Sequence, residues 1–204
     1  MKNLLLMLCL LFVARLPAEI KILALAGSTK QGSFNVRLME EAAKIARQLN
    51  AEVTVIHLQD FSIPLYSEDL EKKMGMPNDV KRLRKLFINS DAIIISSPEY
   101  NASIPALLKN LLDWASRTEE GQGSREAFKD KQFAIMSASP GGGGGARGLK
   151  HLQTIIEALG GKVISLQVSV ANAHDAFDEK NQLKNEEIKK ALKNEIEQLI
   201  SIDK

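Results

Sequence analysis

Residues 27–35, with the sequence GSTKQGSFN, combine the residue types that bind a phosphate group. They follow a run from Ile20 to Ala26 that is apolar except for Lys21, and they precede apolar residues spaced as on one face of a helix. We therefore expect them to join a strand to a helix. Such a junction directs backbone N–H groups and a helix N-terminus at an anion. Side-chain donors and one positive charge come from Ser28, Thr29, Lys30, Ser33 and Asn35. The segment predicts a site for a phosphate monoester, and the alternative is an ordinary polar turn.

Two better-known phosphate motifs do not occur in this segment. Gly27 and Gly32 have the spacing of G-x-x-x-x-G-K-[ST], but Ser33 and Phe34 stand where that motif has Lys and Ser or Thr. Because the lysine that contacts the β- and γ-phosphates is missing, hydrolysis of a nucleoside triphosphate is not expected. The segment also contains no G-x-G-x-x-G, so it is not the dinucleotide-binding fingerprint.

Two later segments also follow predicted strands and are equally unusual. Residues 97–105 (SPEYNASIP) have a backbone restrained by two prolines, with Tyr100 and Asn101 between them, and would suit a planar heteroaromatic ring with a polar edge. Residues 141–145 are consecutive glycines, which let the backbone approach a flat ring without side chains in between. A phosphate together with a flat, polar-edged ring describes flavin mononucleotide (FMN). The alternatives are a rigid turn for 97–105 and a flexible linker for 141–145.

The order of the predicted elements places the three segments at one edge of a sheet. Apolar strands are predicted at 20–26, 52–58, 91–96, 132–137 and 163–168. Helices are predicted at 38–49, 80–88, 105–114, 146–159 and 188–199, and residues 59–77 are expected to be an irregular polar stretch. This alternation predicts a single α/β domain, residues 19–204, with a parallel, doubly wound sheet. Ligands of such sheets bind at the carboxyl ends of the strands, where all three segments would lie.

Composition argues against several other classes of function. The 204 residues carry a net charge of +2 with acidic and basic side chains interspersed, so no nucleic-acid-binding surface is expected. Cys9 is the only cysteine, which rules out an intramolecular disulfide. His57, His151 and His174 are far apart in the sequence, and a dedicated metal site is not expected.

Residues 1–18 differ from the rest of the chain. Lys2 precedes a leucine-rich apolar run at 4–14, and Ala18 is a small residue of the kind found at cleavage sites. This pattern resembles a secretory signal peptide, and the run is too short for a stable membrane span. Arg15 directly after the run fits that pattern poorly, and the alternative is a translation start placed too far upstream. Either interpretation leaves residues 1–18 outside the folded domain.

Three segments together resemble the NADPH-dependent FMN reductase family of flavodoxin-like proteins, which includes quinone, chromate and azo-dye reductases. Residues 27–35 resemble its G-S-x-R-x-x-S-x-N phosphate loop, and residues 139–147 resemble its glycine-rich third loop. The most specific match is that of residues 97–114 to the signature P-E-Y-N-x-S-x-P…L-K-N…D-W. The resemblance runs from Glu19 to about residue 200 and implies a flavodoxin-like three-layer sandwich with a five-stranded parallel sheet.

The resemblance also implies which residues contact FMN. Those implied to hold the phosphate are Ser28, Lys30, Ser33, Phe34 and Asn35. Those implied to lie against the ribityl chain and the isoalloxazine ring are Pro98, Glu99, Tyr100, Asn101, Ser139, Gly141, Gly142 and Gly143. Lys30 stands where the family has arginine, and because lysine keeps the charge but lacks the bidentate geometry, somewhat weaker FMN binding is expected.

The activity that the resemblance implies is an FMN-dependent NAD(P)H oxidoreductase. Hydride would pass from NADPH or NADH through FMN to a small acceptor such as a quinone, free flavin, an azo compound or chromate. No catalytic side chain is required, and Tyr100 and Asn101 are the candidates for shaping the ring environment. The family further implies a homodimer or homotetramer in the cytoplasm, whereas a cleaved leader at 1–18 would imply export. Two alternatives stay open: a flavodoxin-type electron carrier without NAD(P)H oxidation, and a family member that has lost its flavin.

Overall fold

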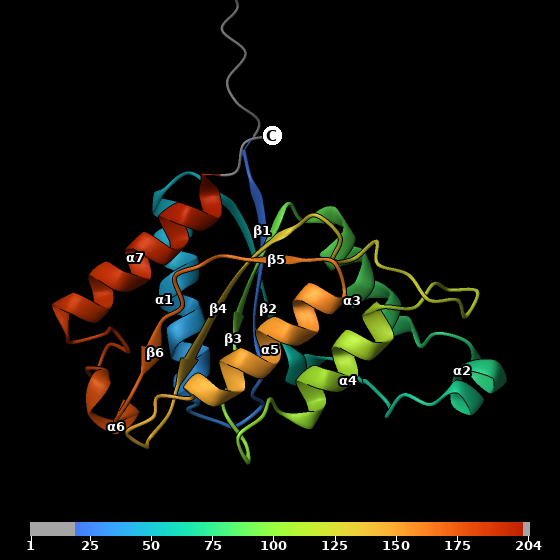
Figure 1. Cartoon of the computed structure of the whole chain (residues 1–204), viewed down its shortest axis with the longest axis horizontal. Coiled ribbons are helices and arrows are strands. Elements are labelled where there is room, and N and C mark those ends of the chain that lie inside the picture. Colours follow the sequence, from blue (N-terminus) through green and yellow to red (C-terminus); the bar gives the residue numbers. More distant parts are fainter. Residues whose placement is uncertain (1–18, 202–204) are drawn as a thin grey trace, which may run out of the picture.

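A parallel sheet lies between two layers of helices in the computed structural model, which describes residues 19–201 (Figure 1). In chain order the strands are β1 (Lys21–Ala26), β2 (Glu52–His57), β3 (Ala92–Ser96), β4 (Gln132–Ala138), β5 (Lys162–Val163) and β6 (Ser169–Val170). Their order in the sheet is β2-β1-β3-β4-β5, and β6 pairs with the last residues of β4. The order reverses between β1 and β3, so the carboxyl ends of these strands form a topological switch point. The predicted flavodoxin-like fold is confirmed, with β6 as an additional short strand.

Helices cover both faces of the sheet. One face carries α1 (Phe34–Gln48) and α7 (Glu186–Ile200), and the other carries α3 (Asn78–Asn89), α4 (Ala106–Ala115) and α5 (Ala146–Ala158). Strand β1 contributes to both cores: Ile22 and Ala24 pack in the α1–α7 layer, and Leu23 and Leu25 in the opposite layer. A strand that is buried on both faces is apolar at its buried positions, which explains the unbroken apolar run at 22–26, whereas Lys21 at the start of β1 is exposed.

The stretch 59–77 contains a helix, which corrects the expectation that it is irregular. Helix α2 (Glu68–Met74) follows a short 3-10 helix (Leu58–Asp60), and Ser67 caps α2 by accepting a hydrogen bond from the N–H of Leu70 at 3.1 Å. Glu71 is the one buried residue of α2, so the helix lacks the apolar period by which packed helices are recognised. The four-residue helix α6 (Ala173–Ala176) was not predicted from the sequence either.

The fifth predicted strand, 163–168, is in fact interrupted, and β5 and β6 are each two residues long. The N–H of Ile164 still donates to the carbonyl of Phe133 at 3.0 Å. The N–H of Val168 instead donates to the side-chain oxygen Oε2 of Glu195 on α7 at 3.0 Å. A buried side chain from α7 has therefore taken the place of a strand partner, which no local pattern at 163–168 could predict.

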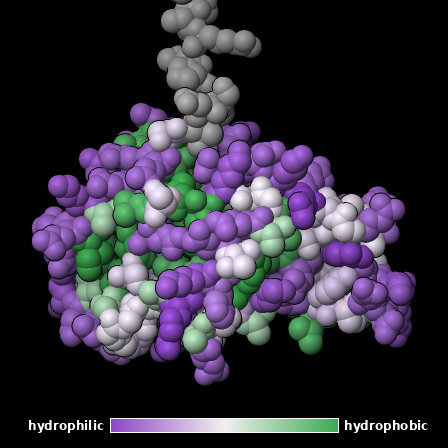
Figure 2. Space-filling model, viewed as in Figure 1, coloured by the Kyte–Doolittle hydropathy of each residue, from purple (hydrophilic) through white to green (hydrophobic). Residues whose placement is uncertain are grey.

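Polar residues dominate the face of the molecule shown in Figure 2, and apolar residues show mainly between α7 and α5. Within residues 19–201, none of the helices has both the length and the apolar character that crossing a bilayer requires. The signal-like residues 1–18 lie outside the described part of the chain, so both interpretations of them stay predictions.

Candidate functional site

The segments that follow β1, β3 and β4 meet at the carboxyl edge of the sheet, around a cavity of about 160 Å³. The segment after β1 contributes Ser28, Lys30, Gly32, Ser33, Phe34 and Asn35 to its lining. The other two segments contribute Pro98, Glu99, Tyr100, Ser139 and Pro140, and Ala138 at the end of β4 also lines the cavity. Nine of the thirteen residues predicted to contact a cofactor therefore lie around one cavity, although they come from three distant parts of the sequence.

Four predicted residues lie outside this lining. They are exposed on adjoining turns: Asn101, Gly141, Gly142 and Gly143. Three lining residues, Gly32, Ala138 and Pro140, were not predicted. Each is next in sequence to a predicted residue, Ser33 or Ser139, and that adjacency is the signal by which they could have been found.

Residues 27–35 form a turn with unpaired backbone donors. The N–H of Lys30 donates to Ser28 Oγ at 3.2 Å, and the N–H of Ser33 donates to the carbonyl of Lys30 at 3.1 Å. Within residues 19–201 the N–H groups of Gln31 and Gly32 have no hydrogen-bond partner, and the first turn of α1 has the free N–H groups of any helix N-terminus. Lys30 is exposed, and within residues 19–201 its ammonium group forms no ion pair with an acidic side chain. This set of donors fits a phosphate group.

The segment after β3 makes a tight turn that presents Tyr100. The N–H and carbonyl of Tyr100 pair with the carbonyl and N–H of Ser103 at 2.9 and 3.0 Å. Asn101 (φ 51°) and Ala102 (φ 64°) between them are both left-handed, as in a two-residue hairpin turn. The side chain of Tyr100 lines the cavity although the residue is 52% exposed, so an aromatic surface is open to a flat ligand.

Glu99 joins the segment after β3 to the N-terminus of α5. Its carboxylate accepts hydrogen bonds from the N–H groups of Arg147 and Gly148, each at 3.0 Å, and from Arg147 Nε at 2.9 Å. Burial opposes ionisation of Glu99, but the hydrogen bonds from Arg147 and Gly148 outweigh it and hold the pKa of this carboxyl below its ordinary value. The Glu99 carboxylate thus acts as a cap on α5 and fixes two loops relative to each other.

The glycine run after β4 has two parts with different surroundings. Gly142 and Gly143 have no atoms within 4 Å of the position that a Cβ would occupy, so they are open to solvent. Gly144 (φ +59°) and Gly145 (φ +87°) are left-handed and buried, and a Cβ on Gly145 would lie 2.0 Å from Ser137 Oγ. The close approach of backbone expected for this run is therefore made by its last two residues, to strands β4 and β6.

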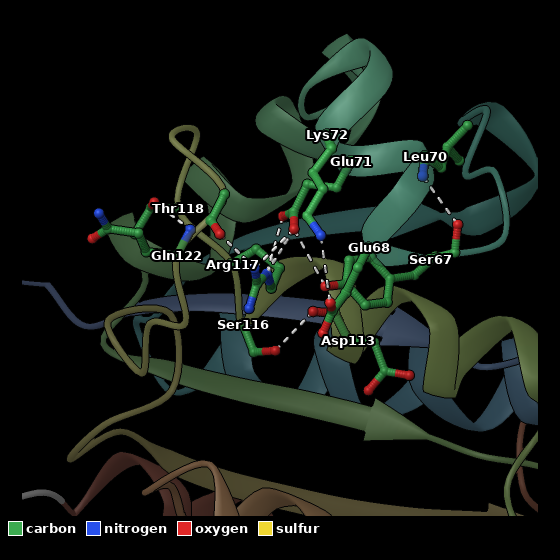
Figure 3. A network of polar contacts seen from close by, with 12 residues as sticks. Ser67, Glu68, Leu70, Glu71, Lys72, Asp113, Ser116, Arg117, Thr118 and Gln122 are labelled. Atoms are coloured by element: carbon green, nitrogen blue, oxygen red, sulfur yellow. Dashed lines mark hydrogen bonds and ion pairs between the residues drawn. The ribbon is translucent and has the colours of Figure 1, made fainter.

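A larger hollow, about 480 Å³, lies between α2 and residues 117–121 and shares no lining residue with the three loops. Figure 3 shows the ion pair beside it, in which Arg117 donates to Glu71 through Nε at 3.0 Å and through Nη2 at 2.8 Å. The other charged residues of the lining are Glu68, Lys72, Glu119 and Glu120. This excess of carboxylates repels a phosphate, so the smaller cavity is the better candidate for an anionic ligand.

A doubly wound sheet with an anion-suited cavity at its switch point defines a flavodoxin-like α/β protein. The model of the NADPH-dependent FMN reductase family matches residues 20–175, and the chain belongs to this family. The resemblance inferred from the motifs is confirmed, and the protein is an oxidoreductase.

Relatives of known type agree with this assignment over most of the chain. An NAD(P)H-dependent FMN reductase of Pseudomonas aeruginosa is 34% identical over 183 residues, which are 89% of this chain and 94% of the relative. An NADPH:quinone oxidoreductase of Arabidopsis thaliana is 33% identical over 177 residues, 85% of this chain and 87% of the relative. Among solved structures, FerB, a flavoenzyme NAD(P)H:(acceptor) oxidoreductase of Paracoccus denitrificans, superposes with a TM-score of 0.75 at 27% identity, covering 89% of this chain and 95% of FerB.

Proposed function

We propose that this protein is an FMN-dependent NAD(P)H oxidoreductase whose acceptor is a quinone or another small molecule of the kinds reduced by its family, such as free flavin, an azo compound or chromate. The observation that carries the proposal is the convergence of three loops on one cavity at the switch point, in a chain of the NADPH-dependent FMN reductase family. When bound, FMN supplies the redox chemistry by accepting hydride from NAD(P)H and passing it to the acceptor.

The chain's own residues bind and orient the cofactor in this proposal. Ser28, Lys30 and Ser33, with the free N–H groups of Gln31 and Gly32, hold the phosphate. Pro98 and Tyr100 line the part of the cavity beside the ring. Asn101 and the exposed glycines 141–143 belong to the turns that border this side, where they would contact the ring or the incoming substrate. Assembly of the chain into a homodimer or homotetramer stays a prediction, and so does its location in the cytoplasm or outside the cell.

Replacing Lys30 by alanine is expected to weaken FMN binding about tenfold and to leave riboflavin binding unchanged, because riboflavin lacks the phosphate that the ammonium group contacts. Titration of the apoprotein with each flavin, followed by quenching of flavin fluorescence, measures both dissociation constants. Lys85→Ala on α3 removes an exposed lysine outside the cavity lining and serves as the control. An equal loss for FMN and riboflavin in Lys30→Ala would contradict the phosphate assignment.

Replacing Tyr100 by alanine is expected to lower kcat/KM for quinone reduction by about tenfold while the melting temperature changes little, because the exposed ring contributes little to the core. Steady-state rates and thermal melts give the two readouts. Leu65→Ala, which removes an exposed apolar side chain outside the cavity lining, should change neither. Unchanged rates in Tyr100→Ala would count against a role of this ring beside the flavin.

The proposed function is tested directly by the visible spectrum of the full-length protein loaded with FMN. Under anaerobic conditions, addition of NADPH or NADH should bleach the flavin absorbance, and addition of a quinone should restore it. Flavin that binds but is bleached by neither nucleotide would point to an electron carrier instead. Failure to bind FMN at all would reject the cofactor assignment.

A further inference from the structure

The amide side chain of Asn35 connects the three segments that surround the cavity. Its Nδ2 donates to the carbonyl of Ala138 at 2.8 Å, and its Oδ1 accepts from the N–H of Ala138 at 3.0 Å. The same Oδ1 accepts from Ser96 Oγ at 3.1 Å. Asn35 is 3% exposed and Ser96 is fully buried, so these bonds are shielded from water.

These three residues lie where the three cavity segments begin or end. Asn35 lies in the first turn of α1, where the segment after β1 ends. Ser96 is the last residue of β3, and Ala138 is the last residue of β4, so the other two cavity segments begin directly after them. One side chain therefore ties together the bases of all three loops, across 61 residues to Ser96 and 103 residues to Ala138.

The hydrogen-bonding capacity of Asn35 is nearly used up by these contacts. An asparagine amide has two N–H donors and one oxygen with two lone pairs. Both lone pairs and one N–H are engaged within the protein, which leaves a single N–H of a nearly buried group. With only this N–H left to donate, the Asn35 side chain can contribute little as a direct phosphate ligand. The family resemblance had implied that Asn35 helps to hold the phosphate.

We propose that Asn35 acts as a positioning residue, which holds the three loops in the arrangement that binds the whole flavin rather than the phosphate alone. This inference rests on the proposed FMN site and concerns how this chain builds it. Loss of the amide frees the N–H and carbonyl of Ala138 and the hydroxyl of Ser96, all in the interior, so the loop bases would shift relative to one another. Contacts to the ring, the ribityl chain and the phosphate would then weaken together.

The test compares FMN with riboflavin in the variants Asn35→Ala and Lys30→Ala. For Asn35→Ala, both dissociation constants should rise by a similar factor, about tenfold or more, so their ratio stays near the wild-type value. For Lys30→Ala, the constant for FMN alone should rise. A rise confined to FMN in Asn35→Ala would overturn the proposal and make Asn35 a phosphate ligand. Unchanged dissociation constants together with a lower melting temperature would overturn it in favour of a purely structural role.

A second variant guards against poor folding of Asn35→Ala. Ser96→Ala removes one of the three bonds to Asn35, and Ser96 does not line the cavity. It should raise the dissociation constants for FMN and riboflavin by the same smaller factor, about two- to fivefold, and unchanged constants would contradict the proposal. Titration of the wild-type protein distinguishes failure of the proposed FMN-dependent function from failure of the positioning role of Asn35. If the wild type binds neither flavin, the proposed function fails. If it binds both, the results for the variants test the role of Asn35 alone.

Discussion

Replacing Gly145 by alanine is expected to destabilise the protein by about 2–4 kcal/mol and to displace the N-terminus of α5. A Cβ on this residue would lie 2.0 Å from Ser137 Oγ and 2.9 Å from Ser137 Cβ. Rotation of the serine side chain relieves only the first contact, since its Cβ is held by strand β4. The φ of Gly145, +87°, adds strain for any residue with a side chain.

The displacement would reach the cavity through Glu99. Its carboxylate caps the first turn of α5 at the N–H groups of Arg147 and Gly148, so movement of that turn pulls on the segment that carries Tyr100. Chemical denaturation measures the loss of stability, and flavin titration measures the effect on the site. Gly143→Ala is the matched control within the same run, because nothing lies within 4 Å of its Cβ position, and its effect should stay within about 0.5 kcal/mol. Equal stability of the two variants would contradict this account of the glycine run.

Replacing Glu195 by glutamine is expected to make the protein more stable than wild type at pH 8. Glu195 is fully buried on α7, its Oε2 accepts the N–H of Val168, and its Oε1 has no hydrogen-bond partner within residues 19–201. Burial raises the pKa of this carboxyl from the ordinary 4.5 to about 8, and the hydrogen bond from Val168 offsets the rise only in part. The folded protein therefore keeps the proton that the unfolded chain releases above about pH 4.5.

The sign of the pH dependence follows from this difference in bound protons. Between about pH 4.5 and pH 8 the folded state binds more protons at Glu195 than the unfolded state, so the contribution of this residue to stability falls as pH rises. Each unit of pKa difference corresponds to about 1.4 kcal/mol, which makes the total several kcal/mol. Glutamine has nearly the same shape and is neutral at every pH, so its free energy of unfolding should lack this decline.

Denaturation of the wild type and of Glu195→Gln at a series of pH values from 5 to 8.5 tests the prediction. The two stability profiles should diverge as pH rises. Glu197→Gln, on the same helix but with an exposed carboxylate, is the control and should follow the wild-type profile. Parallel profiles for wild type and Glu195→Gln would show that Glu195 is ionised in the folded protein.

Local sequence patterns were sufficient to predict the fold class and the convergence of the three segments at the candidate site. Strand β1 and the turn at 27–35 were predicted because a continuous apolar run and a cluster of small polar residues are properties of adjacent residues. The convergence of three loops also followed from the sequence, since the carboxyl ends of parallel strands must lie at one edge of their sheet. Helix α2 was missed because it buries only Glu71, so no apolar period marks it.

The role of individual side chains was decided only by the tertiary structure. Asn35 and Glu99 have the polar character of cofactor ligands in the sequence, yet their hydrogen-bond partners lie 103 and 48 residues away, at Ala138 and Arg147. Five identical glycines, 141–145, divide into an open part and a packed part because only the last two meet β4 and β6. The sequence determined which fold forms and where the segment proposed to bind a phosphate lies. The physical reason that it determined no more is that burial and hydrogen-bond satisfaction depend on contacts between residues far apart in the chain.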